Sequence, residues 1–331
     1  MSALNLALLG ADVAETTQDN LPPLSFEPSI LHCSKLVTMS IKPRSFVLAP
    51  FWREGDLGFI HGPRGLGKTW LSLTLAKAAS SGTSPVPWFE CPSATPVLYV
   101  DGEMTLDAIR TRMLSLGAED GPLYVLSHEQ HFSATEGILN LTDTQQQQAI
   151  TTLCLTKGIK VLFLDNLSCL FSGVKENDAD SWELVLPWLL SLRRHGISVV
   201  VVAHSGRNGE MRGTSRREDA AAWVLRLDES HSHTTPGAKF LASFTKNRHA
   251  TEDKCPPLDW SFQTGTDGKV SIGCRLLDEM EQLRLVIGDG QTRCSDIAEI
   301  TGWSKSKVSR VARKAVAAGW LAMDGRNYQL K

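Results

Sequence analysis

Short runs of apolar residues alternate with amphipathic stretches between residues 45 and 275. The apolar runs cover 57–61, 96–101, 123–127, 160–165 and 198–203, and each is as long as one buried strand. Helical spacing of apolar positions marks 68–80, 105–116, 143–157 and 179–195. Two later runs, 239–245 and 270–274, are expected to add antiparallel strands at one edge. This alternation predicts an α/β domain built on a mostly parallel central sheet.

The two ends of the chain have a different pattern. Residues 1–44 show no sustained period and are interrupted by Pro22, Pro23 and Pro28, which indicates a loosely ordered arm suited to docking on a neighbour. Residues 276–331 contain short helical segments and many lysines and arginines. We therefore expect an N-terminal arm at 1–44, an α/β domain at 45–275 and a small C-terminal domain at 276–331.

A glycine-rich segment follows the first apolar run of the α/β domain. It reads Gly62-Pro63-Arg64-Gly65-Leu66-Gly67-Lys68-Thr69 and matches the pattern G-x-x-x-x-G-K-[ST]. Glycines let the backbone N–H groups turn toward a phosphate, and the helix that continues from Trp70 directs its positive end at the same point. Lys68 would contact the β- and γ-phosphates, and the Thr69 hydroxyl would bind Mg²⁺. The residues from Gly62 to Trp70 therefore predict a site for ATP and Mg²⁺.

Polar residues also end three of the predicted strands. Asp165 follows four apolar residues, at the strand end where open α/β sheets bind ligands, and is the expected second contact for Mg²⁺. Glu103, in the segment Asp101-Gly102-Glu103, would orient or deprotonate the attacking water, although Asp101 could take the same part. His204 ends the run at 198–203 and would face the γ-phosphate.

Six segments carry a resemblance to a known family. In chain order they are HGPRGLGKTW, VLYVDGEM, VLFLDNLSCLFSG, VVVVAHSG, RGTSRRED and FTKNRH. Together they resemble the RecA-like superfamily and, more closely, the RepA-type hexameric replicative helicases of plasmids and other mobile elements. The resemblance covers about residues 45–250. It implies a RecA-like P-loop core with Glu103 as the catalytic glutamate, Asp165 as the metal-binding aspartate and His204 as the γ-phosphate sensor.

The same resemblance implies that the ATP site lies between subunits of a ring. The neighbouring subunit would then contribute Arg248 as a finger, with Lys246 as its companion. The basic segment 205–218 would line the central channel and contact single-stranded DNA through Arg207, Arg212 and Arg216. From the residues alone, solvated charges on a surface remain the alternative for both segments.

The C-terminal domain reads as helix, turn, helix and hairpin. The helices are expected at 295–300 and 305–318, and the hairpin would turn at Asp324-Gly325. From Ser304 to the end, seven basic residues stand against one acidic residue, although the whole chain has a net charge of −2. This pattern resembles a winged helix-turn-helix, whose second helix enters the major groove of DNA. The alternative is a module that docks a protein. The expected DNA contacts are Lys305, Lys307, Arg310, Arg313 and Lys314.

Composition narrows the class of protein further. Hydrophobic residues make up 42% and charged residues 21%, as in a globular protein that buries a core. Seven cysteines without a C-x-x-C pair indicate reduced thiols rather than a disulfide framework or a zinc site. The N-terminus lacks the basic start of a signal peptide, and the apolar runs are too short to span a bilayer. We therefore expect a soluble cytoplasmic protein with no membrane partner.

These observations favour an ATP-driven DNA helicase or translocase that forms a ring, with a hexamer as the expected homo-oligomer. Its setting would be replication of a plasmid, phage or other mobile element. One alternative is an ATP-dependent DNA-binding regulator that does not unwind DNA. A filament-forming recombination mediator and an ATPase that acts on a protein are two others.

Overall fold

The computed structural model describes residues 26–119, 121–172, 182, 184–206, 215–230, 237–251, 253–301, 303–325 and 327–331. The chain divides into two compact units, Met1–Pro43 and Arg44–Lys331. In the first unit, η2 (Glu27–Ser29) and α1 (Cys33–Thr38) are short, and every described residue is exposed. The described part of this unit therefore builds no hydrophobic core of its own.

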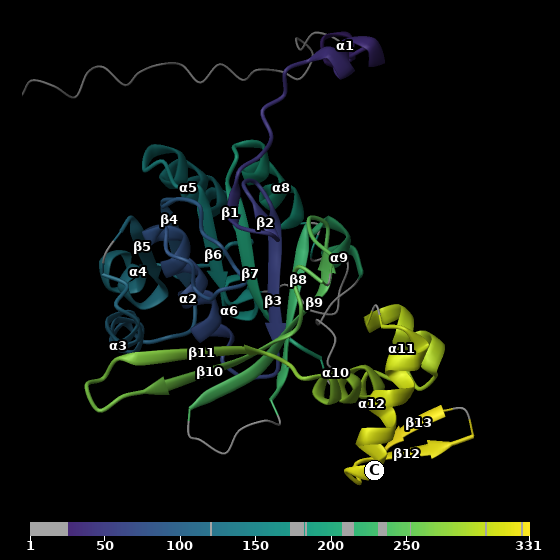
Figure 1. Ribbon diagram of the computed structural model, residues 1–331. Helices are drawn as coiled ribbons and strands as arrows, with labels where there is room; N and C mark the ends of the chain where they lie inside the picture. The colour runs from purple at the N-terminus through teal and green to yellow at the C-terminus, as the bar shows by residue number, and fades with distance from the viewer. Residues whose placement is uncertain are drawn as a thin grey trace, which may run out of the picture. The chain divides into compact units, whose positions relative to one another are not determined.

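A nine-stranded sheet forms the centre of the second unit (Figure 1). Its strand order is β11-β10-β9-β8-β3-β7-β6-β4-β5. The six strands from β8 to β5 are parallel, and β9, β10 and β11 continue the sheet as antiparallel strands. The parallel strands are β3 (Leu57–Gly62), β4 (Val97–Asp101), β5 (Leu123–Ser127), β6 (Val161–Asp165), β7 (Ser198–His204) and β8 (Trp223–Glu229). The antiparallel strands are β9 (Ala238–Asn247), β10 (Leu258–Thr264) and β11 (Val270–Leu276).

Hydrophobic cores cover both faces of this sheet, because successive residues of a strand point to opposite faces. In β6, Val161 and Phe163 join one buried cluster, whereas Leu162 and Leu164 join the other. The first cluster includes side chains of α2 (Lys68–Ser81), and the second includes those of α5 (Thr144–Thr156) and α8 (Leu186–Arg194). The remaining elements of the α/β region are β1 (Phe46–Leu48), β2 (Trp52–Arg53), α3 (Leu106–Leu116), α4 (His128–Thr135), α6 (Leu167–Leu170) and α9 (Ser215–Ala220).

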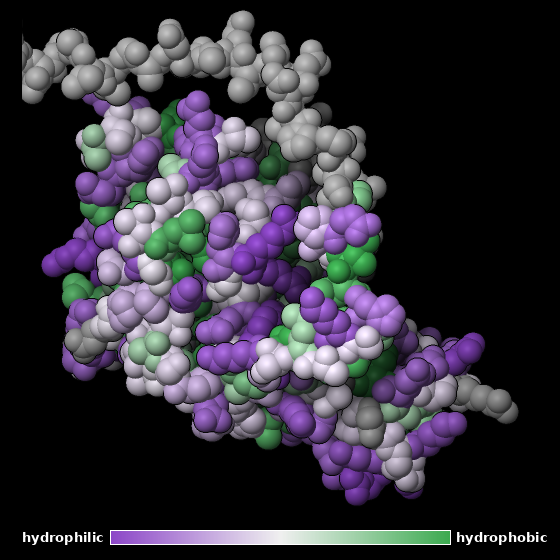
Figure 2. Space-filling view, turned by 90° about the horizontal axis from the view of Figure 1, so that it is seen from above, coloured by the Kyte–Doolittle hydropathy of each residue, from purple (hydrophilic) through white to green (hydrophobic). Residues whose placement is uncertain are grey.

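These elements confirm the α/β class with a mostly parallel sheet, and they show where the sequence prediction was incomplete. All five predicted parallel strands are present, but β8 and β10 were not predicted. The helix expected at 179–195 is described only as α8, and residues 173–181 and 183 lie outside the described part. Figure 2 shows a face covered mainly by hydrophilic residues, with small hydrophobic patches between them.

The C-terminal part has a core of its own. It consists of α10 (Glu279–Gly288), α11 (Cys294–Thr301), α12 (Lys305–Ala317) and a hairpin of β12 (Leu321–Asp324) and β13 (Asn327–Leu330). Leu283, Ile297 and Val311, from the three helices, are completely buried in one cluster with Leu321 of the hairpin. The Asp278 side chain caps α10 in a capping box with Glu281.

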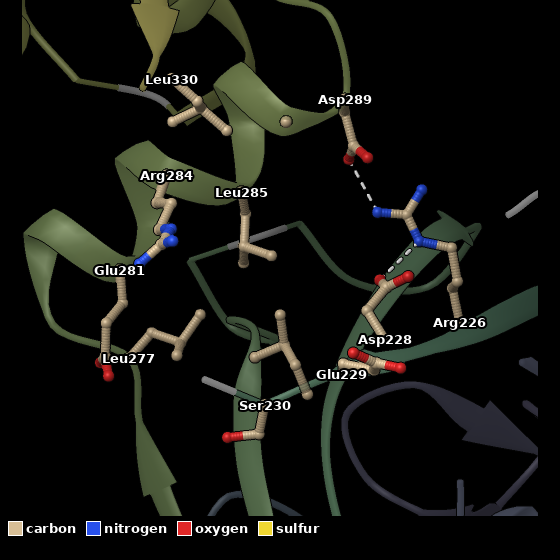
Figure 3. A pocket seen from close by; sticks show the side chains of 12 residues that line it. Arg226, Asp228, Glu229, Ser230, Leu277, Glu281, Arg284, Leu285, Asp289 and Leu330 are labelled. Atoms are coloured by element: carbon tan, nitrogen blue, oxygen red, sulfur yellow. Dashed lines mark hydrogen bonds and ion pairs between the residues drawn. The ribbon is translucent and has the colours of Figure 1, made fainter. Parts of the chain in front are cut away.

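An ion pair of Arg226 connects β8 with this C-terminal part (Figure 3). Arg226 of β8 lies 2.7 Å from the carboxylate of Asp228 and 2.7 Å from that of Asp289, which follows α10. A cavity of about 440 Å³ lies beside these pairs, with leucines such as Leu241 and Leu285 in its lining. Among the described residues, no helix is both long enough and apolar enough to cross a membrane.

Candidate nucleotide-binding site

The glycine-rich loop joins the end of β3 to the start of α2, and two of its glycines have backbones that disfavour other residues. Gly65 and Gly67 have φ angles of +75° and +112°. A Cβ atom on Gly67 would also lie 2.8 Å from Cε1 of Phe240, whereas nothing lies within 4 Å of one on Gly65. Gly67 therefore combines a backbone requirement with close packing, and it begins α2 as the N-cap.

Lys68 is buried, and its amine is folded back onto the loop. Its Nζ donates hydrogen bonds to the carbonyl oxygens of Gly62, at 2.9 Å, and Pro63, at 2.7 Å. Burial lowers the pKa of Lys68 to about 8, and the nearby charges of Asp165 and Glu103 oppose this shift. An arriving phosphate could replace the two carbonyl oxygens as acceptor without a change of fold.

Asp165 ends β6 in a network of hydroxyl groups. Its Oδ2 accepts hydrogen bonds from the Tyr99 hydroxyl at 2.5 Å and from Ser72 Oγ at 3.5 Å, and the Thr69 hydroxyl bonds to the same carboxylate. Burial raises the pKa of Asp165, and the hydroxyl donors counteract that effect. Thr69 and Asp165, the two expected Mg²⁺ contacts, are therefore direct neighbours.

The two candidate catalytic carboxylates differ in exposure. Asp101 is buried and accepts the backbone N–H of Met104 at 3.0 Å, whereas Glu103 is exposed. Burial raises the pKa of Asp101 to about 7, and the charge of Asp165 adds to the shift. Glu103 Oε2 accepts a hydrogen bond from the side-chain amide of Asn166. Of the two, Glu103 has the more accessible carboxylate.

A cavity of about 410 Å³ gathers most of the predicted nucleotide contacts. The predicted residues in its lining are Arg64, Gly65, Gly67, Lys68, Thr69, Trp70, Asp101, Glu103, Asp165 and His204. Gly62, Pro63 and Leu66 are not part of the lining. His204 reaches the cavity because β7 pairs with β3 in a register that places it opposite Gly62.

The lining also contains residues that the sequence prediction missed. These are Met104, Arg112, Asn166 and Ala238. The Arg112 guanidinium lies 5.2 Å from the centre of the Trp70 ring, so the two form a cation–π pair at the cavity. Asn166 could have been suspected because it directly follows Asp165. Arg112 carries no comparable signal in the sequence.

The oxygen atoms at this site fit a magnesium ion held together with a nucleotide. Among the residues that the structure describes, no group of three or more His, Cys, Asp or Glu side chains could hold a metal ion by itself. Mg²⁺ is usually bound by one or two protein oxygens, substrate phosphates and water. The Thr69 hydroxyl beside the buried Asp165 carboxylate supplies two such oxygens.

Lys246 and Arg248 do not line this cavity of their own chain. Lys246 Nζ donates to the carbonyl oxygens of Glu218 and Asp219 near the end of α9. Arg248 is exposed, and its guanidinium donates to the Asp219 carbonyl oxygen at 2.7 Å. Both cations therefore lie beside α9, the helix in which the basic segment 205–218 ends.

The predicted DNA contacts are only partly described. Arg207 and Arg212 lie outside the described residues, and Arg216 belongs to α9, where its side chain is not described. In the C-terminal part, Lys307 and Arg310 pair with Glu279 at 3.2 and 3.3 Å. The other expected contacts, Lys305, Arg313 and Lys314, are exposed on α12.

The chain is similar to a known protein family and, at low identity, to solved structures. The AAA domain family AAA_25 matches residues 23–210. The solved structure of a KaiC-like protein from the archaeon Pyrococcus horikoshii is 15% identical in sequence and has a TM-score of 0.47. The match covers 70% of this chain and 99% of the KaiC-like protein. The flagellar accessory protein FlaH from Methanocaldococcus jannaschii is 14% identical in sequence and has a TM-score of 0.42. This match covers 66% of this chain and 90% of FlaH. A search of curated proteins found no match.

The family match covers more than half of the chain and includes the glycine-rich loop, the carboxylates at 101, 103 and 165, and His204. The chain therefore belongs to the AAA domain family AAA_25 and is an ATPase with a RecA-like P-loop core.

Proposed function

We propose that this ATPase is a ring-forming DNA motor, a helicase or translocase that hydrolyses ATP between subunits during replication of a plasmid, phage or other mobile element. The observation that carries the proposal is the position of Arg248. Its exposed guanidinium is absent from the nucleotide cavity of its own chain, and a neighbouring copy could receive it. The six segments that resemble RepA-type hexameric helicases support the same assignment.

The residues around the cavity have separate parts in this mechanism. Lys68 and the N–H groups at the start of α2 would hold the phosphates, and Thr69 and Asp165 would hold Mg²⁺. Bound Mg²⁺ would supply charge neutralisation at the phosphates. Glu103 would accept a proton from the attacking water, while Asn166 orients its carboxylate. His204, opposite Gly62 at the end of β7, would contact the γ-phosphate and relay its presence to the segment that follows.

DNA would be contacted at two places. Arg207, Arg212 and Arg216 would bind the phosphates of single-stranded DNA in the channel of a hexamer. Lys246 and Arg248 donate hydrogen bonds to the end of α9. A movement of α9 when DNA binds would therefore also move these two cations, which would contact the ATP bound to the neighbouring subunit. Five basic residues of α12 would contact duplex DNA, as in a winged helix-turn-helix.

A second candidate is an ATP-dependent DNA-binding regulator that does not separate strands. The C-terminal part favours it, because α12 presents exposed basic residues on a separate hydrophobic core. Such a switch would bind duplex DNA in a nucleotide-dependent way. The two candidates share the ATPase site and differ in what hydrolysis accomplishes.

Three measurements on the purified full chain test the proposal. A motor should show ATPase activity stimulated by single-stranded DNA, should displace an annealed strand, and should have the native mass of a ring when nucleotide is present. Lys68→Ala should abolish nucleotide binding, ATPase activity and strand displacement, whereas Lys160→Ala, at an exposed lysine before β6, should change none of the three measurements. Nucleotide-dependent duplex binding without strand displacement would favour the regulator. ATPase activity indifferent to DNA would reject both.

A further inference from the structure

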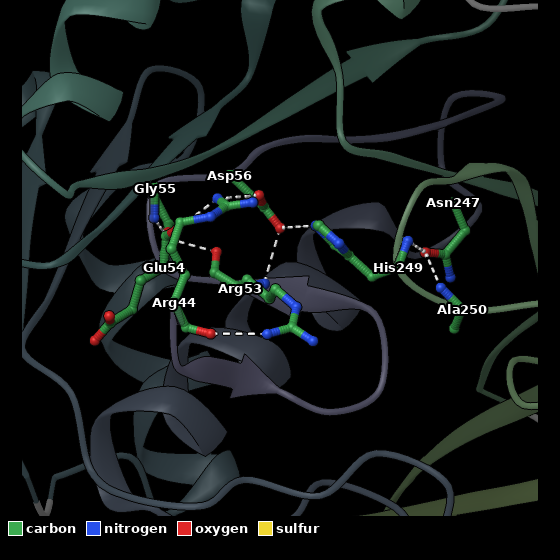
Figure 4. A network of polar contacts seen from close by, with 9 residues as sticks. Arg44, Arg53, Glu54, Gly55, Asp56, Asn247, His249 and Ala250 are labelled. Atoms are coloured by element: carbon green, nitrogen blue, oxygen red, sulfur yellow. Dashed lines mark hydrogen bonds and ion pairs between the residues drawn. The ribbon is translucent and has the colours of Figure 1, made fainter. Parts of the chain in front are cut away.

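Hydrogen bonds to the side chain of Asn247 hold the turn after β9 (Figure 4). The Asn247 Oδ1 atom accepts the N–H groups of His249, at 3.0 Å, and Ala250, at 3.2 Å. The Arg248 N–H itself donates to the carbonyl oxygen of Ala222 at 2.9 Å. Three hydrogen bonds therefore hold the main chain from which the Arg248 side chain projects.

A buried carboxylate fastens this turn to the start of the P-loop strand. Asp56 directly precedes β3, and its side chain is completely buried. It accepts hydrogen bonds from Arg44 at 2.7 Å, from the backbone N–H of Arg53 at 2.8 Å and from Nε2 of His249 at 2.8 Å. A buried carboxylate requires such donors, so the His249 ring cannot leave without a cost to Asp56.

The Arg248 side chain differs from this rigid base because it is exposed. Its guanidinium donates to the Asp219 carbonyl oxygen, and Arg248 is not among the residues that line the cavity that holds Lys68. A cation on an immobilised backbone keeps its position while a second molecule approaches. Such an arrangement suits a group that acts on another subunit.

We propose that Asp56, acting through His249, is a positioning residue that holds Arg248 in place for the nucleotide site of a second copy of this chain. The inference rests on the proposed function, in which Arg248 completes that site. Asp56 and His249 do not line the nucleotide cavity, and in this proposal they act only through the turn at 247–250. Their loss should lower the turnover number of the assembly and leave nucleotide affinity unchanged.

The first test compares substitutions of His249 in the full chain. His249→Phe removes the donor to Asp56 and should lower kcat by between about ten- and a hundred-fold, with KM for ATP unchanged. His249→Gln keeps a side-chain N–H and should restore most of the turnover. His195→Gln, at an exposed histidine after α8, is the matched control and should behave like wild type. Unchanged kcat in His249→Phe, or a raised KM with normal kcat, overturns the proposal.

Mixed assemblies separate positioning from general damage to the fold. His249→Phe subunits keep an intact nucleotide cavity, and Lys68→Ala subunits keep a correctly held Arg248, so mixtures should regain activity that neither variant shows alone. If the mixture has the native mass of a ring in the presence of nucleotide but regains no activity, the proposal is overturned. Asn247→Ala removes the hydrogen bonds that the Asn247 side chain accepts from the same turn. It should lower kcat and regain activity in mixtures as His249→Phe does, and it replaces that variant if His249→Phe does not fold.

Arg248→Ala distinguishes failure of the inference from failure of the proposed function. If Arg248→Ala subunits mixed with Lys68→Ala subunits regain no activity, the shared site is wrong. If they do regain activity while His249→Phe alone turns over like wild type, only the role of Asp56 and His249 is wrong.

Discussion

Asp101 and Asp165 lie opposite each other on neighbouring strands β4 and β6, and both are buried. Two carboxylates at the ends of adjacent parallel strands repel one another when both are ionised. In a P-loop ATPase this is the place where a divalent cation is held, so the repulsion in the protein without nucleotide reflects its binding function.

Asp101→Asn should therefore stabilise the protein in the absence of nucleotide. The pKa of Asp101 is raised from 3.8 to about 7, so the folded state favours the protonated carboxyl. The Asp101 carboxyl contributes its full share of stability below pH 3.8, and this share is lost as the pH rises to 7. The difference in unfolding free energy between Asp101→Asn and wild type should be near zero at pH 4 and should grow to at most about 4 kcal/mol above pH 7.

Chemical unfolding at pH 4, 6 and 8 measures this difference. Asp324→Asn, which changes an exposed aspartate at the end of β12, provides the control and should show no such trend. A difference between Asp101→Asn and wild type that does not vary with pH would contradict the assigned cause.

Gly67→Ala should destabilise the protein more than Gly65→Ala. Both positions have positive φ, so each alanine should cost about 1–2 kcal/mol through the backbone alone. Gly67→Ala also forces a Cβ against the ring of Phe240, which should add about 1–3 kcal/mol unless that ring shifts. The unfolding midpoints of the two variants measure this difference. Equal losses of stability in the two variants would show that the Phe240 ring moves aside without an energetic cost.

Glu103→Gln should bind nucleotide normally and lose hydrolysis. The amide keeps the size of the side chain but cannot take a proton from water, so kcat should fall by about 10²–10⁴. Asn166→Ala removes the hydrogen bond to Glu103 and should lower kcat by less. Steady-state turnover beside nucleotide binding checks both variants. Wild-type turnover in Glu103→Gln would remove Glu103 from the mechanism and return the role to Asp101.

The sequence predicted those parts of the fold and site that are encoded locally. Spacing of glycines with Lys68 marks the phosphate loop, and apolar runs that end in Asp165 and His204 mark buried strands with polar ends. Because parallel strands end at the same edge of a sheet, their meeting at one cavity followed from the fold class.

Features that depend on the register of distant segments escaped prediction. Strand β8 was missed because Arg226 interrupts its apolar pattern, and that charge is tolerated only because Asp228 and Asp289 pair with it. Arg112 reaches the nucleotide cavity through the packing of α3 beside Trp70, which no local spacing reveals. The bond between Asp56 and His249 joins residues that are 193 positions apart.

Glu279 should weaken any contact that α12 makes with DNA. It pairs with Lys307 and Arg310, and the hydrogen bond from Lys307, with the charges of Lys307, Arg310 and Lys314, lowers the pKa of Glu279. Three of the five cations expected to bind DNA therefore lie close to one carboxylate. A DNA phosphate must compete with this internal anion for the same donors.

Glu279→Gln removes the competing charge and should tighten binding of duplex DNA by several-fold. It should also steepen the fall of affinity with salt, because more counterions are released when more cations meet phosphates. Fluorescence anisotropy with a labelled duplex between about 50 and 200 mM salt measures both effects. Glu299→Gln, at an exposed glutamate on α11, changes the net charge equally without touching α12 and should give a smaller gain. Equal gains in the two variants would mean that only net charge matters, and no binding in either would favour α12 as a surface that docks protein.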